Sequence, residues 1–268
     1  MKRKFALLGH NISYSLSPLI HSVIYEFYGI DASYELISAT EEELDATVEK
    51  LRGYDGFNVT KPHKINILRF LDEDRSETGS VNTVSVDKGR MTGYTTDGFG
   101  FSGHFGMVYG SPRGKKCLVL GAGGVARIIV PELIKNGAEV SIFNRTEPKA
   151  ADMAAEFGCG HLSAGGLNGC RPEIIVNCTS CGLRAGEDPL PDVNLSHLEF
   201  VYDTIYSPPV TDLMKRCSAF AKTENGLGML ILQAIKADEI MLNIDTMSDI
   251  NILYERIKER VCDEIAHN

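Results

Sequence analysis

The chain has 268 residues, enough for one large or two modest domains with a sizeable buried core. Charged residues make up 24% of it and hydrophobic residues 43%, which excludes a disordered chain and a membrane-spanning one. The net charge is −9 and there is no basic block, which argues against a nucleic acid or an anionic membrane as partner.

The cysteines do not form a disulfide framework. They are odd in number and scattered: Cys117, Cys159, Cys170, Cys178, Cys181, Cys217 and Cys262. This usage is typical of a reducing compartment, and the apolar run near the N-terminus is too short for a signal peptide, so we expect a cytoplasmic protein. Cys178 and Cys181 form a C-x-x-C without the second pair or the histidines that zinc requires. We expect buried neutral thiols there and no metal.

Strand and helix patterns alternate along most of the chain, which predicts an α/β architecture with largely parallel sheets. In the first part, we expect strands at 4–9, 33–38 and 56–60, helices at 17–29 and 40–53, and a hairpin over 81–94 that turns at 87–89.

Local signals predict where these helices begin. Ser17 is the expected N-cap of the first helix, with Pro18 at its first position. Thr40 and Glu43 are spaced as a capping box for the second. Pro62 predicts the start of a third helix, with Lys64 in its first turn.

A second α/β pattern begins near residue 115. Residues 115–147 predict a strand, a glycine turn, a helix and a strand, and further strands follow at 173–179 and 198–206. The last helices, at 227–240 and 248–263, have no strand after them and are expected to fold back onto the first part. We therefore expect an N-terminal α/β domain, 1–101 completed by 231–268, and a C-terminal Rossmann-type dinucleotide-binding domain, 102–230.

The glycine turn fits the dinucleotide fingerprint in its Gly/Ala form. Gly121, Gly123 and Ala126 have the required spacing, directly after a strand and at the start of a helix. Glycines let backbone N–H groups approach a pyrophosphate, which the helix N-terminus also favours electrostatically. A simple tight turn that binds nothing is the alternative.

The end of the next strand indicates which dinucleotide is bound. An NAD site usually has an acid about 20 residues after the glycines, where it bonds the ribose 2′-hydroxyl. This chain has Asn144, Arg145 and Thr146 there instead. A charge-assisted bond from the guanidinium to a 2′-phosphate contributes about 1.5–3 kcal/mol, or about one to two decades of preference. We infer NADP, with a solvated loop arginine as the alternative.

A nicotinamide cofactor requires a polar substrate pocket and a proton donor. Four segments offer them: "SYSLSP", "NVTKPHK", "SVNTV" and "YTTDG". Ser15 and Ser17 precede a helix N-terminus and suit a carboxylate. Lys64 and Asp97 are a titratable pair that could move a proton to a developing alkoxide. Each residue alone is more often a cap or a surface charge, so only the four segments together indicate a substrate pocket.

These segments resemble the shikimate dehydrogenases, NADP-linked reductases of chorismate and aromatic amino-acid biosynthesis. The resemblance runs nearly end to end, in the order of that family: "SYSLSP", "GFNVTKPHK", "GSVNTV", "TDGFG", "LGAGGVAR", "NRT", "NCTSCGL", "YDTIYSPPVT" and "NGLGMLILQA". It implies a substrate-binding and catalytic first domain and an NADP-binding second domain.

The resemblance also implies roles for single residues. Lys64 is catalytic and Asp97 is its acid–base partner, with acid and base not assigned between them. The residues that contact substrate are Ser15 and Ser17 at its carboxylate, then Thr60, Asn82, Tyr206 and Gln233. The residues around NADP are Gly121, Ala122, Gly123, Gly124 and Ala126 at the pyrophosphate, Asn144, Arg145 and Thr146 at the 2′-phosphate, and Thr179, Gly226 and Met229 near the nicotinamide.

The reaction expected from the resemblance is the reversible reduction of 3-dehydroshikimate to shikimate by NADPH, in a monomer or a homodimer. Two features depart from the family: Thr96 stands where an asparagine is common, and the C-terminal stretch lacks the usual aromatic-rich ending. Three alternatives stay open. One is a quinate/shikimate or aminoshikimate dehydrogenase of broader substrate or cofactor use. Another is a non-catalytic ligand sensor, and the third is a methylene-tetrahydrofolate dehydrogenase.

Overall fold

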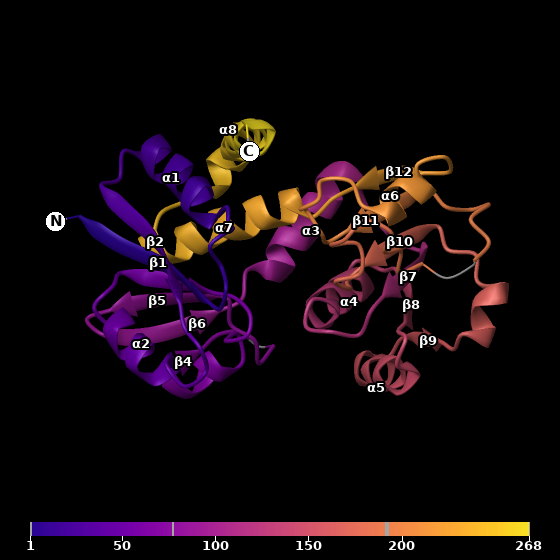
Figure 1. Ribbon diagram of the computed structural model, residues 1–268, viewed down its shortest axis with the longest axis horizontal. Helices are drawn as coiled ribbons and strands as arrows, with labels where there is room; N and C mark the ends of the chain where they lie inside the picture. Colours follow the sequence, from indigo (N-terminus) through magenta and orange to yellow (C-terminus); the bar gives the residue numbers. More distant parts are fainter. Residues whose placement is uncertain (1, 77, 191–192, 268) are drawn as a thin grey trace. The chain divides into compact units, whose positions relative to one another are not determined.

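The computed structural model describes residues 2–76, 78–190 and 193–267. The chain divides into two compact α/β units (Figure 1). The first unit contains the residues up to Gly100 and those from Leu230 onward, and the second contains Phe101–Met229. The α/β class is as predicted, and the C-terminal helices return to the first unit, where the last helix packs against the first one.

The first unit is built on a mixed sheet. Its strands are β1 (Arg3–Gly9), β2 (Ala32–Ser38), β3 (Gly56–Val59), β4 (Glu73–Asp74), β5 (Thr83–Asp87) and β6 (Arg90–Tyr94). Their order across the sheet is β2-β1-β3-β5-β6-β4. β1 runs parallel to β2 and β3, whereas β5 is antiparallel to both of its neighbours. The hairpin turns at Lys88 and Gly89, both with positive φ, as a two-residue turn between β5 and β6 requires.

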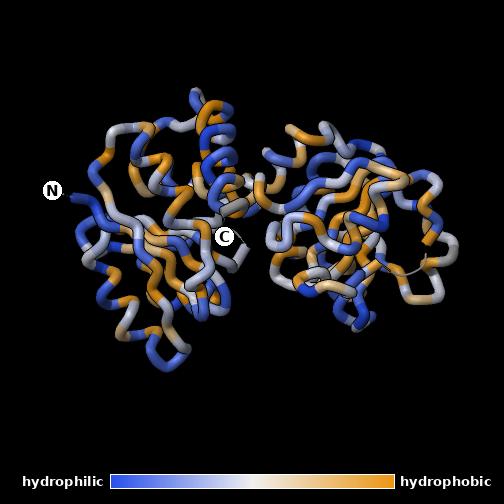
Figure 2. The backbone as a smooth tube through the Cα atoms, turned by 45° about the horizontal axis from the view of Figure 1, so that its top comes forward, coloured by the Kyte–Doolittle hydropathy of each residue, from blue (hydrophilic) through white to orange (hydrophobic). Residues whose placement is uncertain are grey.

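Alternation along β1 fixes the two faces of this sheet. Phe5 packs with α1 (Ser17–Tyr28) and α7 (Leu227–Leu242), and Ala6 and Leu8 pack with α2 (Leu44–Leu51) and the 3₁₀ helix η1 (Asn66–Phe70). The 3₁₀ helix η3 (Met247–Asp249) and α8 (Ile250–His267) complete the unit. The hydrophobic stretches gather on the central strands (Figure 2).

The second unit has an all-parallel sheet in the order β12-β11-β10-β7-β8-β9. Its strands are β7 (Lys116–Leu120), β8 (Glu139–Phe143), β9 (Gly160–Leu162), β10 (Ile174–Asn177), β11 (Phe200–Asp203) and β12 (Lys222–Glu224). Its helices are α3 (Asp97–Val108), which begins in the first unit, α4 (Ala126–Lys135), α5 (Glu147–Phe157), the 3₁₀ helix η2 (Gly165–Gly169) and α6 (Asp212–Cys217).

The strand order reverses between β7 and β10, because the chain builds outward on one side through β8 and β9 and then on the other through β11 and β12. In open parallel sheets, ligands bind beyond the carboxyl ends of the strands at such a switch point. In this Rossmann-type unit, the loops after β7 and β10 are therefore where a ligand is expected to bind.

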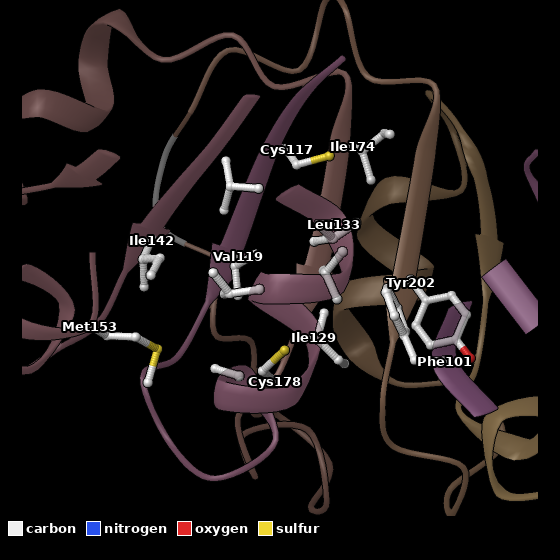
Figure 3. Close-up of a cluster of buried hydrophobic side chains, with 14 of the residues drawn as sticks. Phe101, Cys117, Val119, Ile129, Leu133, Ile142, Met153, Ile174, Cys178 and Tyr202 are labelled. Carbon is white, nitrogen blue, oxygen red and sulfur yellow. The ribbon is translucent and has the colours of Figure 1, made fainter. Parts of the chain in front are cut away.

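Of the two C-x-x-C thiols that the sequence suggested would be buried, only Cys178 is buried. It lies with Cys117 among the apolar side chains of β7, β10, α4 and α5 in the core of the second unit (Figure 3). Burial raises the pKa of both thiols well above the ordinary range. Cys181, the other half of the C-x-x-C, is only partly buried, with its pKa also raised by desolvation.

Three local predictions were wrong. Leu16, not Ser17, is the N-cap of α1, because the Ser17 backbone is already helical. The capping box is half formed, since Glu43 accepts from the Thr40 N–H but α2 begins only at Leu44. No α-helix starts at Pro62 either: residues 61–65 form turns before η1. Buried His63 donates to the Ala39 carbonyl there, and that contact holds the segment against the sheet.

Among the residues that the structure describes, no helix is both long enough and apolar enough to cross a bilayer.

Candidate functional site

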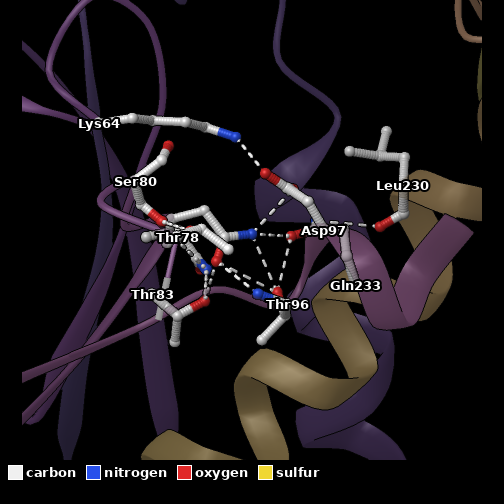
Figure 4. A network of polar contacts seen from close by, with 10 residues as sticks. Lys64, Thr78, Ser80, Thr83, Thr96, Asp97, Leu230 and Gln233 are labelled. Carbon is white, nitrogen blue, oxygen red and sulfur yellow. Dashed lines mark hydrogen bonds and ion pairs between the residues drawn. The ribbon is translucent and has the colours of Figure 1, made fainter. Parts of the chain in front are cut away.

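Lys64 and Asp97 meet in the first unit. Lys64 lies in the turns after β3, and the Val81 N–H donates to its carbonyl. Asp97 is the first residue of α3. The Lys64 Nζ is 2.5 Å from the Asp97 Oδ2, with side chains 26% and 11% exposed (Figure 4). A half-buried ammonium bonded to a nearly buried carboxylate is an arrangement that can pass a proton to a bound oxygen.

Asn82 holds Asp97 from the other side. It is buried just before β5, and its Nδ2 donates to the Asp97 Oδ1 at 2.8 Å. The Asn82 Oδ1 accepts from the Thr96 N–H at 2.8 Å, so the amide orientation is fixed. The same Nδ2 lies 3.1 Å from the Oε1 of Gln233, which α7 brings back from the end of the chain. Lys64, Asn82, Asp97 and Gln233 therefore form one network.

Ser15 and Ser17 lie together at the start of α1. The Ser15 Oγ donates to the Ser17 Oγ at 3.1 Å and also accepts from the Ser17 N–H. Ser15 is half-buried and Ser17 is buried. Two hydroxyls beside the first N–H groups of a helix suit an anion such as a carboxylate.

Thr60 is placed by the sheet. It follows β3, donates its N–H to the Leu8 carbonyl and remains half-buried. The preceding strand contains a residue that the sequence analysis did not single out, Asn58. Its Nδ2 donates to the Asn82 carbonyl and to the Thr83 Oγ1. A polar side chain within a fully buried strand was the signal that could have identified it.

In the second unit, the glycine turn follows β7 at the switch point. Gly121 has φ +104°, and a Cβ there would lie 2.8 Å from the Thr179 Cγ2, so only glycine fits. At Gly123 and Gly124, an added Cβ would meet no described atom within 4 Å, and both residues are exposed. The turn is thus packed on its inner side and open on its outer side, where a pyrophosphate can approach the backbone.

The other predicted cofactor residues cluster at the same edge of the sheet. Ala122 is half-buried beside the turn, and Ala126 is buried at the start of α4. Asn144, Arg145 and Thr146 follow β8, where the Asn144 Nδ2 donates to the Thr146 carbonyl and Arg145 is exposed. Thr179 follows β10, and its hydroxyl donates to the Asn177 Oδ1.

The remaining predicted residues lie after β11 and β12. Tyr206 is half-buried in the loop after β11. Gly226 donates its N–H to the Ile205 carbonyl, and a Cβ on it would lie 2.2 Å from the Thr204 carbonyl oxygen. Met229 is in the first turn of α7 and packs on the second unit's core. Tyr206 is therefore the one predicted substrate residue outside the first unit.

A buried carboxylate holds these loops, and sequence reasoning did not identify it. Asp203, at the end of β11, accepts from the Thr211 hydroxyl at 2.7 Å, the Asn177 amide at 2.9 Å and the Ile205 N–H at 3.0 Å. Burial raises its pKa above the ordinary value, although these bonds favour the charged form. An acid that ends an apolar strand was the available signal.

Over the described ranges, no group of three or more histidine, cysteine or acidic side chains is arranged to hold a metal ion.

Comparisons with known proteins agree with this geometry. Residues 7–84 match the family described as the shikimate dehydrogenase substrate binding domain, and residues 107–179 match shikimate / quinate 5-dehydrogenase. The shikimate dehydrogenase (NADP(+)) of Desulfitobacterium hafniense is 35% identical over 258 residues, covering 90% of this chain and 93% of its own.

Two solved structures share the fold over nearly the whole chain. Shikimate 5-dehydrogenase from Thermus thermophilus, in complex with NADP(H) and shikimate, has 31% identity and a TM-score of 0.85, covering 96% of this chain and 99% of its own. A 5-ketofructose reductase from Gluconobacter has 28% identity and a TM-score of 0.80, covering 97% of this chain and 99% of its own. The fold thus also occurs in a reductase named for a different ketone, so the substrate must be argued from individual residues.

Proposed function

The chain belongs to the shikimate dehydrogenase family, and from that premise we propose that it catalyses the reversible, NADPH-dependent reduction of 3-dehydroshikimate to shikimate. The observation that carries the proposal is the Lys64–Asp97 pair, bonded at 2.5 Å and held by Asn82 and Gln233 within one network. The first unit would bind the substrate and the second unit the cofactor.

The substrate is a ring with one carboxylate and several oxygens, and the first unit offers groups for each. Ser15 and Ser17 would bind the carboxylate. Asn82, Asp97 and Gln233 would bind ring oxygens, because their polar atoms converge near the Lys64 ammonium. Thr60, which follows β3 in the same unit, would add a further hydroxyl. Lys64 with Asp97 would supply the proton to the oxygen that gains negative charge during reduction.

The glycine turn and the loop after β8 fit NADP. The outer side of the turn is open at Gly123 and Gly124, and the loop offers an exposed guanidinium with no acid beside it at Asn144 or Thr146. When bound, NADPH supplies the hydride. The chain's own part is to hold the pyrophosphate on backbone N–H groups and the 2′-phosphate on Arg145.

The test is absorbance at the nicotinamide band while purified protein oxidises shikimate with NADP, with parallel reactions that use NAD or quinate. We expect turnover with shikimate and NADP and little with the other pairs. Comparable turnover with quinate or NAD would instead identify a quinate/shikimate dehydrogenase of broader use.

A ligand sensor is the second candidate, since it would need only the binding groups. The intact Lys64–Asp97 pair argues against it, because binding alone does not require an ammonium group paired at 2.5 Å. Folded protein that binds shikimate but turns over neither substrate with either cofactor would favour the sensor.

A further inference from the structure

Tyr34, on β2, joins two groups of substrate residues that are otherwise separate. Its hydroxyl donates to the Asn58 Oδ1 at 2.8 Å, and its ring stacks on His21, which lies one turn after Ser17 on α1. Ser17 belongs to the serine pair at α1, and Asn58 contacts the carbonyl of Asn82. The phenol therefore stands between the serine pair and the lysine–aspartate pair.

The hydrogen bonds along this path run in one direction. From the phenol onward, Tyr34 donates to the Asn58 Oδ1, and the Asn58 Nδ2 donates to the Thr83 hydroxyl. The path continues through the Thr83 hydroxyl to the Asn82 Oδ1, and the Asn82 Nδ2 donates to Asp97. Because each group donates to the next, the bonds polarise one another, and the orientation of each group depends on its neighbours.

A buried pair holds the ring of Tyr34. The His21 ring stacks on it, with centroids 4.0 Å apart and planes 11° apart. The His21 Nδ1–H donates to the Asp238 Oδ2 at 2.8 Å, and the two side chains are 1% and 0% exposed. His21 comes from α1 and Asp238 from α7, so the tyrosine is fixed by both helices that cover this face of the sheet.

Burying such a pair is costly, and apolar residues of similar volume are often at least as stabilising. Overall stability therefore does not account for it. We propose that Tyr34 is a positioning residue that couples the carboxylate end of the substrate site to the Lys64–Asp97 end, and that the His21–Asp238 pair holds its ring in place. This inference rests on the proposed function, which assigns Ser15 and Ser17 to the carboxylate.

The test compares Tyr34→Phe with the wild-type chain by calorimetric titration of shikimate, followed by steady-state kinetics. Loss of one neutral hydrogen bond predicts a dissociation constant about 3–10-fold higher. We expect the KM for shikimate to rise similarly, while kcat and the KM for NADP stay within about twofold. The matched control is Tyr54→Phe, whose hydroxyl donates to the exposed Glu35, and it should leave shikimate binding unchanged.

The pair is tested by Asp238→Ala and Asp238→Asn, with the melting temperature confirming that each variant folds. Asp238→Ala should weaken shikimate binding as much as Tyr34→Phe does. Asp238→Asn keeps an acceptor for His21 and should therefore retain most of the wild-type affinity for shikimate. The double variant Tyr34→Phe/Asp238→Ala should bind no more weakly than the weaker single variant, because both changes act through one contact.

The outcomes separate this inference from the proposed function. Wild-type binding without turnover would contradict the proposed function alone, because the titration still measures the effect of Tyr34. A Tyr34→Phe variant that binds shikimate as tightly as wild type would overturn the inference and leave the function standing. A parallel rise in the KM for NADP would also overturn it, since that would indicate general damage. If Asp238→Ala does not fold, Tyr34→Phe alone tests the inference. This variant lacks only one oxygen atom and should still fold.

Discussion

At the scale of single residues, the site is defined by pairs that lie far apart in the sequence. Lys64 and Asp97 are 33 residues apart, Asn82 and Gln233 are 151 apart, and His21 and Asp238 are 217 apart. A strand or helix end places Asp97 and Asn82 beside their partners, whereas His21 and Asp238 meet where the interiors of α1 and α7 approach each other. The function of these residues therefore depends on geometry that a small change in side-chain length would remove.

Replacing Lys64 by alanine should lower kcat by about 10²–10⁴-fold, with a much smaller change in KM, because in the proposed reaction the ammonium supplies the proton in the transition state. Steady-state kinetics with shikimate and NADP measures this. Lys61→Ala, which removes an exposed lysine from the same segment, is the control and should behave as wild type. Equal and small changes in kcat and KM would contradict the catalytic role.

The sequence allowed Lys64, Asn82, Asp97 and Gln233 to be proposed together, and the structure brings them into contact; their roles remain predictions. Tyr34 and the His21–Asp238 pair were not proposed. Nothing in the local pattern around a helix histidine or a strand tyrosine indicates which distant side chain it meets. Asn58 and Asp203 did carry a local signal, as polar residues within apolar strands.

At the scale of elements, periodicity predicted most of the long strands and helices, although the cap signals of α1 and α2 were wrong. The helices α3 and α5, of 12 and 11 residues, were not predicted. The short strands β4, β9 and β12, of two or three residues, were not predicted, because so few residues cannot show alternation. The helix expected at Pro62 failed because a buried contact of His63 overrides the local proline signal. Near the site, tertiary contacts therefore determined the secondary structure more than the local sequence signals did.

A glycine-to-alanine substitution should affect cofactor binding on the outer side of the glycine turn and protein stability on its inner side. Gly123→Ala should leave the melting temperature within about 1 °C, because its added methyl meets open space, yet raise the KM for NADP by about tenfold, because the pyrophosphate would occupy that space in the proposed cofactor site. Gly121→Ala should instead lower stability by about 1–3 kcal/mol, because φ is positive and the methyl meets Thr179. An unchanged KM for NADP in Gly123→Ala would contradict the assignment of the turn.

The starts of three strands in the second unit are tied together by Lys115. Its Nζ donates to the Glu173 Oε1 at 3.0 Å, before β10, and to the Glu199 Oε1 at 2.7 Å, before β11. The pKa of Glu173 is lowered first by the Lys116 N–H and then by Lys115. The pKa of Glu199 is lowered first by Lys115. The pKa of Lys115 is raised by both carboxylates.

Lys115→Met should therefore lower the melting temperature at pH 7 by about 1–4 °C, the scale of a partly exposed ion pair. The lowered carboxylate pKa values contribute stability above the ordinary value for glutamate, and this contribution is lost as the pH falls through the folded-state pKa values. The difference from wild type should accordingly shrink in acid, which thermal denaturation from pH 7 to pH 3 would measure. Lys116→Met is the neighbouring control. A difference that grows in acid would contradict the argument.

At the scale of the whole molecule, the first unit is discontinuous in sequence and the second is continuous. The face of β1 that carries Phe5 is covered partly by Ala237, Met241 and Leu242 of α7. α8 adds further buried side chains: Leu253, Tyr254, Ile257 and Val261. Each contributes roughly 1.5–3 kcal/mol when buried, so together they are comparable with the entire stability of a domain.

A fragment of residues 101–229 should therefore fold alone, whereas residues 1–100 should not. Circular dichroism during heating should show a cooperative transition for the first fragment and none for the second. Adding residues 230–268 to the 1–100 fragment through a flexible linker should restore the transition. Cooperative melting of residues 1–100 alone would show that the C-terminal helices are dispensable.

Because the first unit is discontinuous in sequence, the second unit can complete its fold first during translation. The second unit is complete once residue 229 has emerged, whereas the β-strands of the first unit leave the tunnel early and lack the helices that close their apolar face. Residues 1–100 of the newly made chain must therefore stay unaggregated until residues 230–268 have also emerged. The segment that buries their apolar face is synthesised only after the whole of the second unit.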